Sequence, residues 1–66
     1  MKIKTHLIRN KMIDRKMNMV QVAQEIGISY GTFQAIMKRG TCQNGENLGK
    51  LARFAGVKAH EMVSTS

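Results

Sequence analysis

The residues of this chain that are best suited to chemistry lie between Ser29 and Gly40. Apolar side chains recur there at the i, i+3, i+4 spacing of one helix face: Phe33, Ile36 and Met37. A helix that buries this face must turn another set of residues outward: Tyr30, Gly31, Gln34, Ala35 and Lys38. The outward set combines hydrogen-bonding groups, small side chains and a positive charge, and such groups contact the grooves of nucleic acids.

Side chains of these types can recognise the edges of base pairs. Gln34 can make a bidentate pair with adenine, and Ala35 can contact a thymine methyl group. Tyr30 can donate to a base or a phosphate or stack on a sugar, while Gly31 lets the backbone approach closely. The alternative interpretation is that Tyr30 and Gln34 are solvated surface residues without a ligand.

Two short helices joined by a tight turn are predicted to position this face. Asn18 can cap the first helix, and Gln21 stands where a capping box requires Glu or Gln. The buried face of that helix is formed by Val22, Ala23 and Ile26. Gly27 suits the left-handed backbone at a helix end, and Ser29 then caps the second helix, which ends at Gly40.

Helix, short glycine-containing turn and helix is the arrangement of the DNA-binding helix-turn-helix. The sequence resembles the lambda-repressor-like family, which includes the Cro proteins and phage repressors. The residues that carry the resemblance are Met17, Asn18, Val22, Ala23, Gly27, Ile28, Ser29, Phe33 and Ile36. Residues 51–63, LARFAGVKAHEMV, are similar to the fourth and fifth helices of the family. The resemblance implies a compact all-α, five-helix domain over residues 1–66, with the helix-turn-helix formed by helices two and three.

Family position also implies roles for individual residues. Base contacts are implied for Tyr30, Gly31 and Ala35, whereas Gln34 can face either a base or the DNA backbone. The start of helix two and the loop before helix four flank the groove in the family, and basic residues end helix three. Backbone contacts are therefore expected from Asn18, Met19, Thr32, Lys38, Arg39, Gln43 and Asn44.

This sequence departs from the family at three places, and the first is Met19, where relatives often have Gln, whose side chain can donate a hydrogen bond. Relatives often have Gln or Ser where Tyr30 and Gly31 stand, so their base recognition cannot be transferred to this chain. Many relatives also pair an arginine of helix one with a glutamate of helix three. The corresponding residues here are Met12 and Met37, and an apolar pair avoids desolvating two ions.

The charge balance favours a polyanionic partner. The 66 residues include 11 Lys and Arg against 4 Asp and Glu, which gives a formal net charge of +7. The alternative is a basic surface without a ligand, and Lys50, Arg53 and Lys58 are expected to serve solubility alone. The family resemblance implies double-stranded operator DNA as the partner, bound by a homodimer.

The first helix is predicted to begin with Thr5 as its cap and to run to about Lys16. Its apolar stripe consists of Ile3, Leu7, Ile8, Met12, Ile13 and Met17. Such a stripe also occurs in membrane-surface helices, but later helices of this chain can cover it. Residues 1–4 are expected to form a short basic arm, and residues 64–66 a frayed tail.

Two C-terminal helices complete the predicted fold. Asn44 can cap the first of them, whose buried face is Leu48, Leu51, Ala52 and Ala55. Gly49 lies inside this helix at a cost of about 1 kcal/mol relative to alanine, which suggests close packing against another helix. The second helix should run from Val57 to about Val63. Either a dimer surface or the completion of the monomer core is expected from Phe54, Met62 and Val63.

No catalytic or metal-binding pattern is present in the sequence. His6 and His60 lie near opposite ends of the chain, and the acidic residues are scattered: Asp14, Glu25, Glu46 and Glu61. The sequence has no glycine-rich phosphate loop after a strand and no ligand set at metal spacing. We therefore expect a protein that is not an enzyme and that uses no cofactor or metal.

The size and the single cysteine limit the cellular setting. A chain of 66 residues has room for one domain. Cys42 alone cannot form an internal disulfide, which favours a reducing compartment. No apolar run reaches the roughly 18 residues of a membrane span, and the N-terminus lacks a secretory apolar region. A cytoplasmic, nucleoid-associated protein of a bacterial cell or phage-infected host is expected.

The expected function is sequence-specific transcription regulation by a Cro-like or repressor-like protein of phage or prophage origin. A dimer would bind successive major grooves about 34 Å apart on a palindromic operator. One alternative is a restriction–modification controller or antitoxin-type regulator of the same fold. Another is a protein-interaction module that kept the fold and lost operator binding. The chain can be a complete small regulator or the N-terminal domain of a longer repressor.

Overall fold

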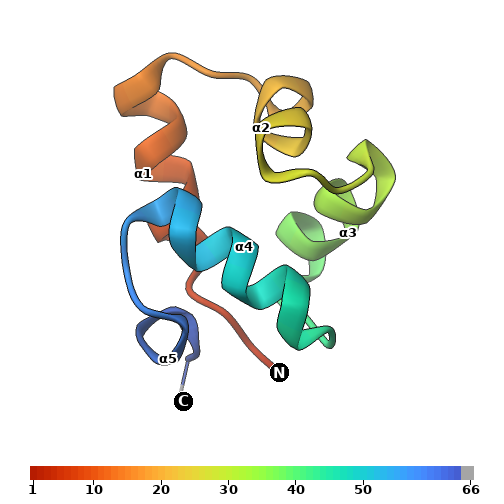
Figure 1. The fold of residues 1–66 in the computed structure, drawn as a ribbon, viewed down its shortest axis with the longest axis vertical. Helices are drawn as coiled ribbons and strands as arrows, with labels where there is room; N and C mark the ends of the chain where they lie inside the picture. Colours follow the sequence, from red (N-terminus) through yellow and green to blue (C-terminus); the bar gives the residue numbers. More distant parts are fainter. Residues whose placement is uncertain (65–66) are drawn as a thin grey trace.

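The computed structural model describes residues 1–64, which form five helices (Figure 1). Their bounds are α1 Thr5–Arg15, α2 Met19–Ile26, α3 Tyr30–Arg39, α4 Gly45–Ala55 and α5 Ala59–Met62. In Figure 1, α4 crosses the middle of the molecule, with α1 on one side and α2 and α3 on the other. Contacts join α4 to α1, α2 and α5, and α2 to α3. The predicted all-α class is therefore confirmed for the described residues.

Side-chain hydrogen bonds cap the N-termini of α2, α3 and α4, as predicted. The Asn18 side chain accepts a hydrogen bond from the Gln21 N–H at 2.8 Å, and the Gln21 side chain accepts one from the Asn18 N–H at 2.9 Å. Ser29 caps α3 by accepting from the Thr32 N–H at 3.2 Å. Asn44 caps α4 in the same way. These local bonds fix where α2, α3 and α4 start.

The first and last helices differ from the prediction. Thr5 is the first helical residue of α1 and not its cap; Lys4 holds the cap position and makes no side-chain cap hydrogen bond. α1 ends at Arg15 because Lys16 adopts a left-handed backbone with φ of 53°. α5 is a single turn of 4 residues, shorter than the predicted helix.

Apolar side chains from all five helices form the core. The buried residues are Ile3, Ile8, Val22, Ala23, Phe33, Ile36, Met37, Cys42, Leu48, Leu51, Ala52, Phe54 and Met62. The predicted inward faces of α2, α3 and α4 are confirmed, with Ile26 and Ala55 packed at their half-buried edges.

Two predictions about packing are wrong. Ile13 is 74% exposed, because α1 buries Ile8 and half-buries Met12, and the next residue lies about 100° further round the helix. Gly49 is exposed, and a β-carbon added there would meet no atom within 4 Å. Close helix packing therefore does not explain this glycine.

The suggested dimer surface belongs to the monomer core. Phe54 is 8% exposed and Met62 is fully buried. Val63 is half-buried and forms an antiparallel β-bridge with Ile3. The second of the two expectations for these residues, completion of the core, is therefore the correct one.

The N-terminal segment 1–4 lies extended between two other parts of the chain. Four backbone hydrogen bonds of 2.8, 2.8, 2.9 and 3.0 Å hold it, joining the pairs Cys42–Met1, Lys4–Met62, Ser64–Lys2 and Ile3–Gly40. Ile3 is buried, while Lys2 and Lys4 are exposed. The segment is thus basic on its outer side but fixed to the chain that follows α3. Residues 65–66 of the expected tail lie outside the described residues.

Candidate nucleic-acid interface

A tight turn from Gly27 to Ser29 sets α3 against α2. Gly27 has φ of 90°, a backbone conformation that is unfavourable for residues with a β-carbon. The N–H groups of Gly27 and Ile28 donate to the Ala23 carbonyl at 2.9 and 3.1 Å. The Ile28 side chain packs on the core from the turn. The position of α3 on the body of the molecule is therefore fixed from its first residue.

The outward face of α3 is exposed. The inward residues Phe33, Ile36 and Met37 are 0%, 7% and 7% exposed. On the other side, Tyr30 is 44% exposed, Gly31 and Gln34 are exposed, and Ala35 is half-buried. The structure brings the four candidate base-contacting residues together on one helix, and their side chains are not needed to complete the core.

The candidate backbone-contacting residues outside α3 lie on the elements that precede and follow it in the chain. Asn18 and Met19 lie at the start of α2, and Gln43 and Asn44 lie in the loop before α4. The side-chain oxygens of Asn18 and Asn44 are used as caps, so the donor that each can offer to a ligand is its NH₂ group. Met19 is half-buried and has no side-chain donor.

Polar and basic residues of α3 itself complete the set. Ser29 donates a hydrogen bond from its hydroxyl to the Thr32 hydroxyl at 2.7 Å, which orients Thr32 at the start of the helix. Lys38 and Arg39 are exposed in the last turn. In residues 1–64 the ion pairs are Arg15–Glu25 and Lys50–Glu46, so both charges at the end of α3 are free of acidic partners.

A hollow of about 260 Å³ adjoins the exposed face of α3. It is lined by Arg9, Met12, Met19, Gln34, Met37 and Lys38. Met12 of α1 and Met37 of α3 therefore line the same hollow. Arg9 was not among the predicted site residues, because it lies far from α3 in the sequence and only the fold brings it to the same hollow.

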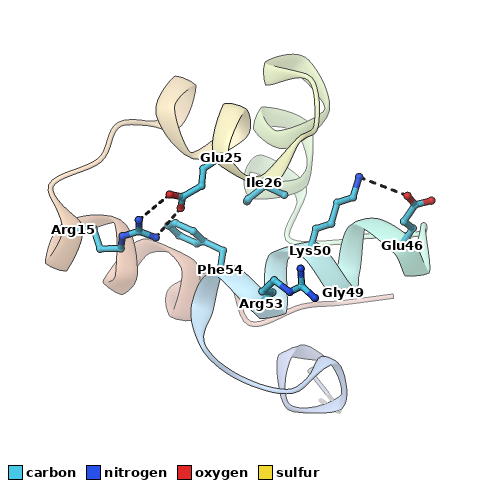
Figure 2. Close-up of a pocket in the computed structure, with 8 residues that line it drawn as sticks. All are labelled: Arg15, Glu25, Ile26, Glu46, Gly49, Lys50, Arg53 and Phe54. Atoms are coloured by element: carbon cyan, nitrogen blue, oxygen red, sulfur yellow. Dashed lines mark hydrogen bonds and ion pairs between the residues drawn. The ribbon is translucent and has the colours of Figure 1, made fainter.

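A larger hollow of about 620 Å³ lies between α1, α2 and α4, and Figure 2 shows the residues that line it. Arg15 makes two hydrogen bonds to Glu25, of 2.7 and 2.8 Å, and its guanidinium carbon lies 5.4 Å from the centre of the Phe54 ring. No residue of α3 lines this hollow. The Arg15–Glu25 pair joins two helices here, and none of the candidate DNA-contacting residues lines this hollow.

Two other classes of site were tested against the structure. Among residues 1–64, no group of three or more His, Cys, Asp or Glu side chains is placed to hold a metal ion. None of the helices in that part of the chain is long and apolar enough to cross a membrane. His6 and His60 lie exposed on α1 and α5, on separate elements.

The sequence is similar to that of a known phage repressor. The chain is 37% identical over 59 residues to a protein of Vibrio cholerae described as the cryptic phage CTXphi transcriptional repressor RstR. The alignment covers 89% of this chain and 53% of the relative, so the chain spans about half the length of the protein that it resembles. No protein-family model matches the chain, and no solved structure matches it.

Proposed function

We propose that this chain is a sequence-specific, double-stranded DNA-binding transcriptional regulator of the lambda-repressor-like type. The observation that carries the proposal is the exposed face of α3, which presents Tyr30, Gly31, Gln34 and Ala35 beside the free charges of Lys38 and Arg39. The similarity to a phage transcriptional repressor supports it independently. The proposal is one of binding and not of catalysis.

In this proposal α3 enters the major groove of B-DNA. That groove is about 12 Å wide and admits one helix. Ala35 would contact a thymine methyl group, Tyr30 would donate to a base or stack on a sugar, and Gly31 would allow close approach of the helix. Because Tyr30 and Gly31 replace the Gln or Ser of many relatives, the preferred operator would differ from theirs.

The elements on either side of α3 would hold the DNA backbone. The α2 residues Met19 and Val20 lie in the first turn, where backbone N–H groups lack intrahelical acceptors, and such groups bind phosphate. On the other side, Gln43 and the NH₂ group of Asn44 would donate to phosphate oxygens. Thr32, Lys38 and Arg39 would add contacts from α3. These contacts position the helix and carry no base preference.

Repression would follow from occupancy of an operator by a homodimer. Two copies of α3 would lie in successive major grooves, about 34 Å apart, on a roughly palindromic site. Bound in this way near a promoter, the dimer would block polymerase inside a bacterial cell or phage-infected host. A single helix in a single groove buries too little surface for tight binding, which is why the proposal includes a dimer.

A titration of labelled DNA from upstream of the protein's own gene tests the function, with a scrambled duplex as competitor and at two salt concentrations. A specific regulator should prefer its site by about 10³-fold or more, with affinity falling steeply as salt rises. Salt-sensitive binding without preference would contradict sequence-specific recognition. Absence of binding at low salt would favour a protein-interaction module of the same fold.

A further inference from the structure

A basic hollow connects α1 to the exposed face of α3. Of its six lining residues, two are cationic, Arg9 and Lys38, and one is a neutral donor, Gln34. The remaining three are methionines: Met12, Met19 and Met37. Within the described part of the chain, no acidic side chain lines the hollow. The hollow thus combines two positive charges and one amide with three apolar methionine side chains.

The two charges come from separate helices and have no acidic partners within residues 1–64. Arg9 lies on α1 and Lys38 on α3, both exposed, and neither takes part in the ion pairs of residues 1–64. Placing like charges around one hollow is unfavourable unless an anion lies between them. A negatively charged ligand between Arg9 and Lys38 would therefore offset the repulsion between their charges.

We propose that this hollow binds one phosphodiester group of the DNA backbone, with Arg9 as its principal contact. This inference rests on the proposed DNA-binding function. The planar guanidinium of Arg9 can give a phosphate two parallel hydrogen bonds, and Lys38 can add a point charge. The amide of Gln34 donates a third contact, so Gln34 serves the backbone and not a base.

The methionines make these contacts stronger. Met37 is 7% exposed, and Met12 and Met19 are half-buried and packed against the core. Their apolar surface supports the stems of Arg9 and Lys38 while the charged ends reach out. It also lowers the local dielectric, in which attraction between a cation and a phosphate increases. Met19 has no side-chain donor, so the donors at this edge of α3 come from Arg9, Gln34 and Lys38.

The position of the hollow favours backbone phosphate over a free anion. Gln34 and Lys38 belong both to its rim and to the exposed face of α3. A duplex that accommodates α3 in its major groove has a phosphate chain along each edge of that groove. One of those chains passes the side of α3 that faces α1, where Arg9 lies.

The test compares Arg9→Gln with Arg53→Gln in the full chain. Both variants lower the net charge by one at an exposed arginine, but Arg53 lines the other hollow, away from α3. Arg9→Gln should weaken binding to the preferred and scrambled duplexes by the same factor, about tenfold. It should also reduce the slope of log K against log salt by about 0.9, the value for one phosphate. Arg53→Gln should change neither quantity appreciably.

A series of duplexes, each with one neutral methylphosphonate at a different position of the site, locates the phosphate that Arg9 contacts. At one position the substitution should weaken binding of the natural chain and have little further effect on Arg9→Gln. Equal behaviour of the two arginine variants, or a change in the preference between duplexes, would overturn the phosphate assignment while leaving DNA binding intact. Failure of the natural chain to bind any duplex would overturn the proposed function itself.

Discussion

The guanidinium of Arg15 holds the carboxylate of Glu25 through two hydrogen bonds of 2.7 and 2.8 Å, and so joins the end of α1 to the end of α2. The same guanidinium lies 5.4 Å from the centre of the Phe54 ring on α4 (Figure 2). One arginine of α1 therefore contacts both α2 and α4. Both charged side chains are nearly half exposed, at 45% and 44%, so their attraction is partly screened by water.

We expect Arg15→Lys to lower the free energy of unfolding by about 1 kcal/mol. Lysine keeps the charge but loses the second hydrogen bond and the flat contact with Phe54. Urea unfolding followed by circular dichroism measures the change. Glu46→Gln is the matched control, because it breaks the single 3.7 Å pair with Lys50 within α4, which contributes about 0.3–0.5 kcal/mol. Equal effects would show that the geometry of the Arg15–Glu25 pair has no special value.

Replacing Met37 with glutamate should destabilise the fold by about 3 kcal/mol or more, because a buried carboxylate would lack a partner. Gln34→Glu on the exposed side of the same helix is the control for charge and should have little effect on the thermal midpoint. Adding Met12→Arg to the Met37→Glu variant should recover part of the loss, since both residues line one hollow. No recovery would contradict their pairing.

Gly49→Ala should stabilise the protein by about 0.5–1 kcal/mol. The glycine is exposed inside α4 and a β-carbon there meets nothing within 4 Å, so alanine gains helix propensity without strain. Gly27→Ala should have the opposite sign, at about 1–2 kcal/mol, because Gly27 has φ of 90°. Thermal unfolding of the two variants compares them directly, and a destabilised Gly49→Ala variant would indicate a contact at this surface that the monomer lacks.

Tyr30→Ala should reduce the preference for the operator over a scrambled duplex by about 1–3 kcal/mol, the value of one base contact. The fold should be unaffected, because the tyrosine is 44% exposed and outside the core. Ile13→Ala, at a residue that is 74% exposed on α1 and outside the candidate interface, controls for loss of surface area. An unchanged preference in competition titrations of Tyr30→Ala would remove Tyr30 from the base-contacting set.

Local signals account for the parts of the fold that were predicted correctly. Asn18, Ser29 and Asn44 cap helices through bonds that reach two or three residues, so a short stretch of sequence is enough to locate them. The apolar spacing of Phe33, Ile36 and Met37 likewise identified the inward face of α3, and hence the exposed candidate site opposite.

The errors arose where distant segments meet. The stripe of α1 included Ile13, but the width of the buried strip depends on which helices cover it, and they leave Ile13 exposed. The Arg15–Glu25 pair joins residues ten apart on two helices, a spacing that no motif encodes. Arg9 entered the candidate site for the same reason, because the fold places residues of α1 and α3 around one hollow. Which bases or phosphates each residue contacts stays a prediction.

The extended N-terminal segment should couple the stability of the chain after α3 to that of the chain after α5. Its backbone forms hydrogen bonds with Gly40 and Cys42 after α3, and also with Met62 and Ser64 after α5. The segment therefore links the end of α3 to the end of α5. If the N-terminal segment 1–4 detaches, the end of α3 and the region after α5 should lose these hydrogen bonds together. The amide hydrogens of Ile3, Lys4 and Cys42 should therefore exchange with solvent at similar rates. A tag that strains Met1 would then also disturb the helix at the candidate DNA interface.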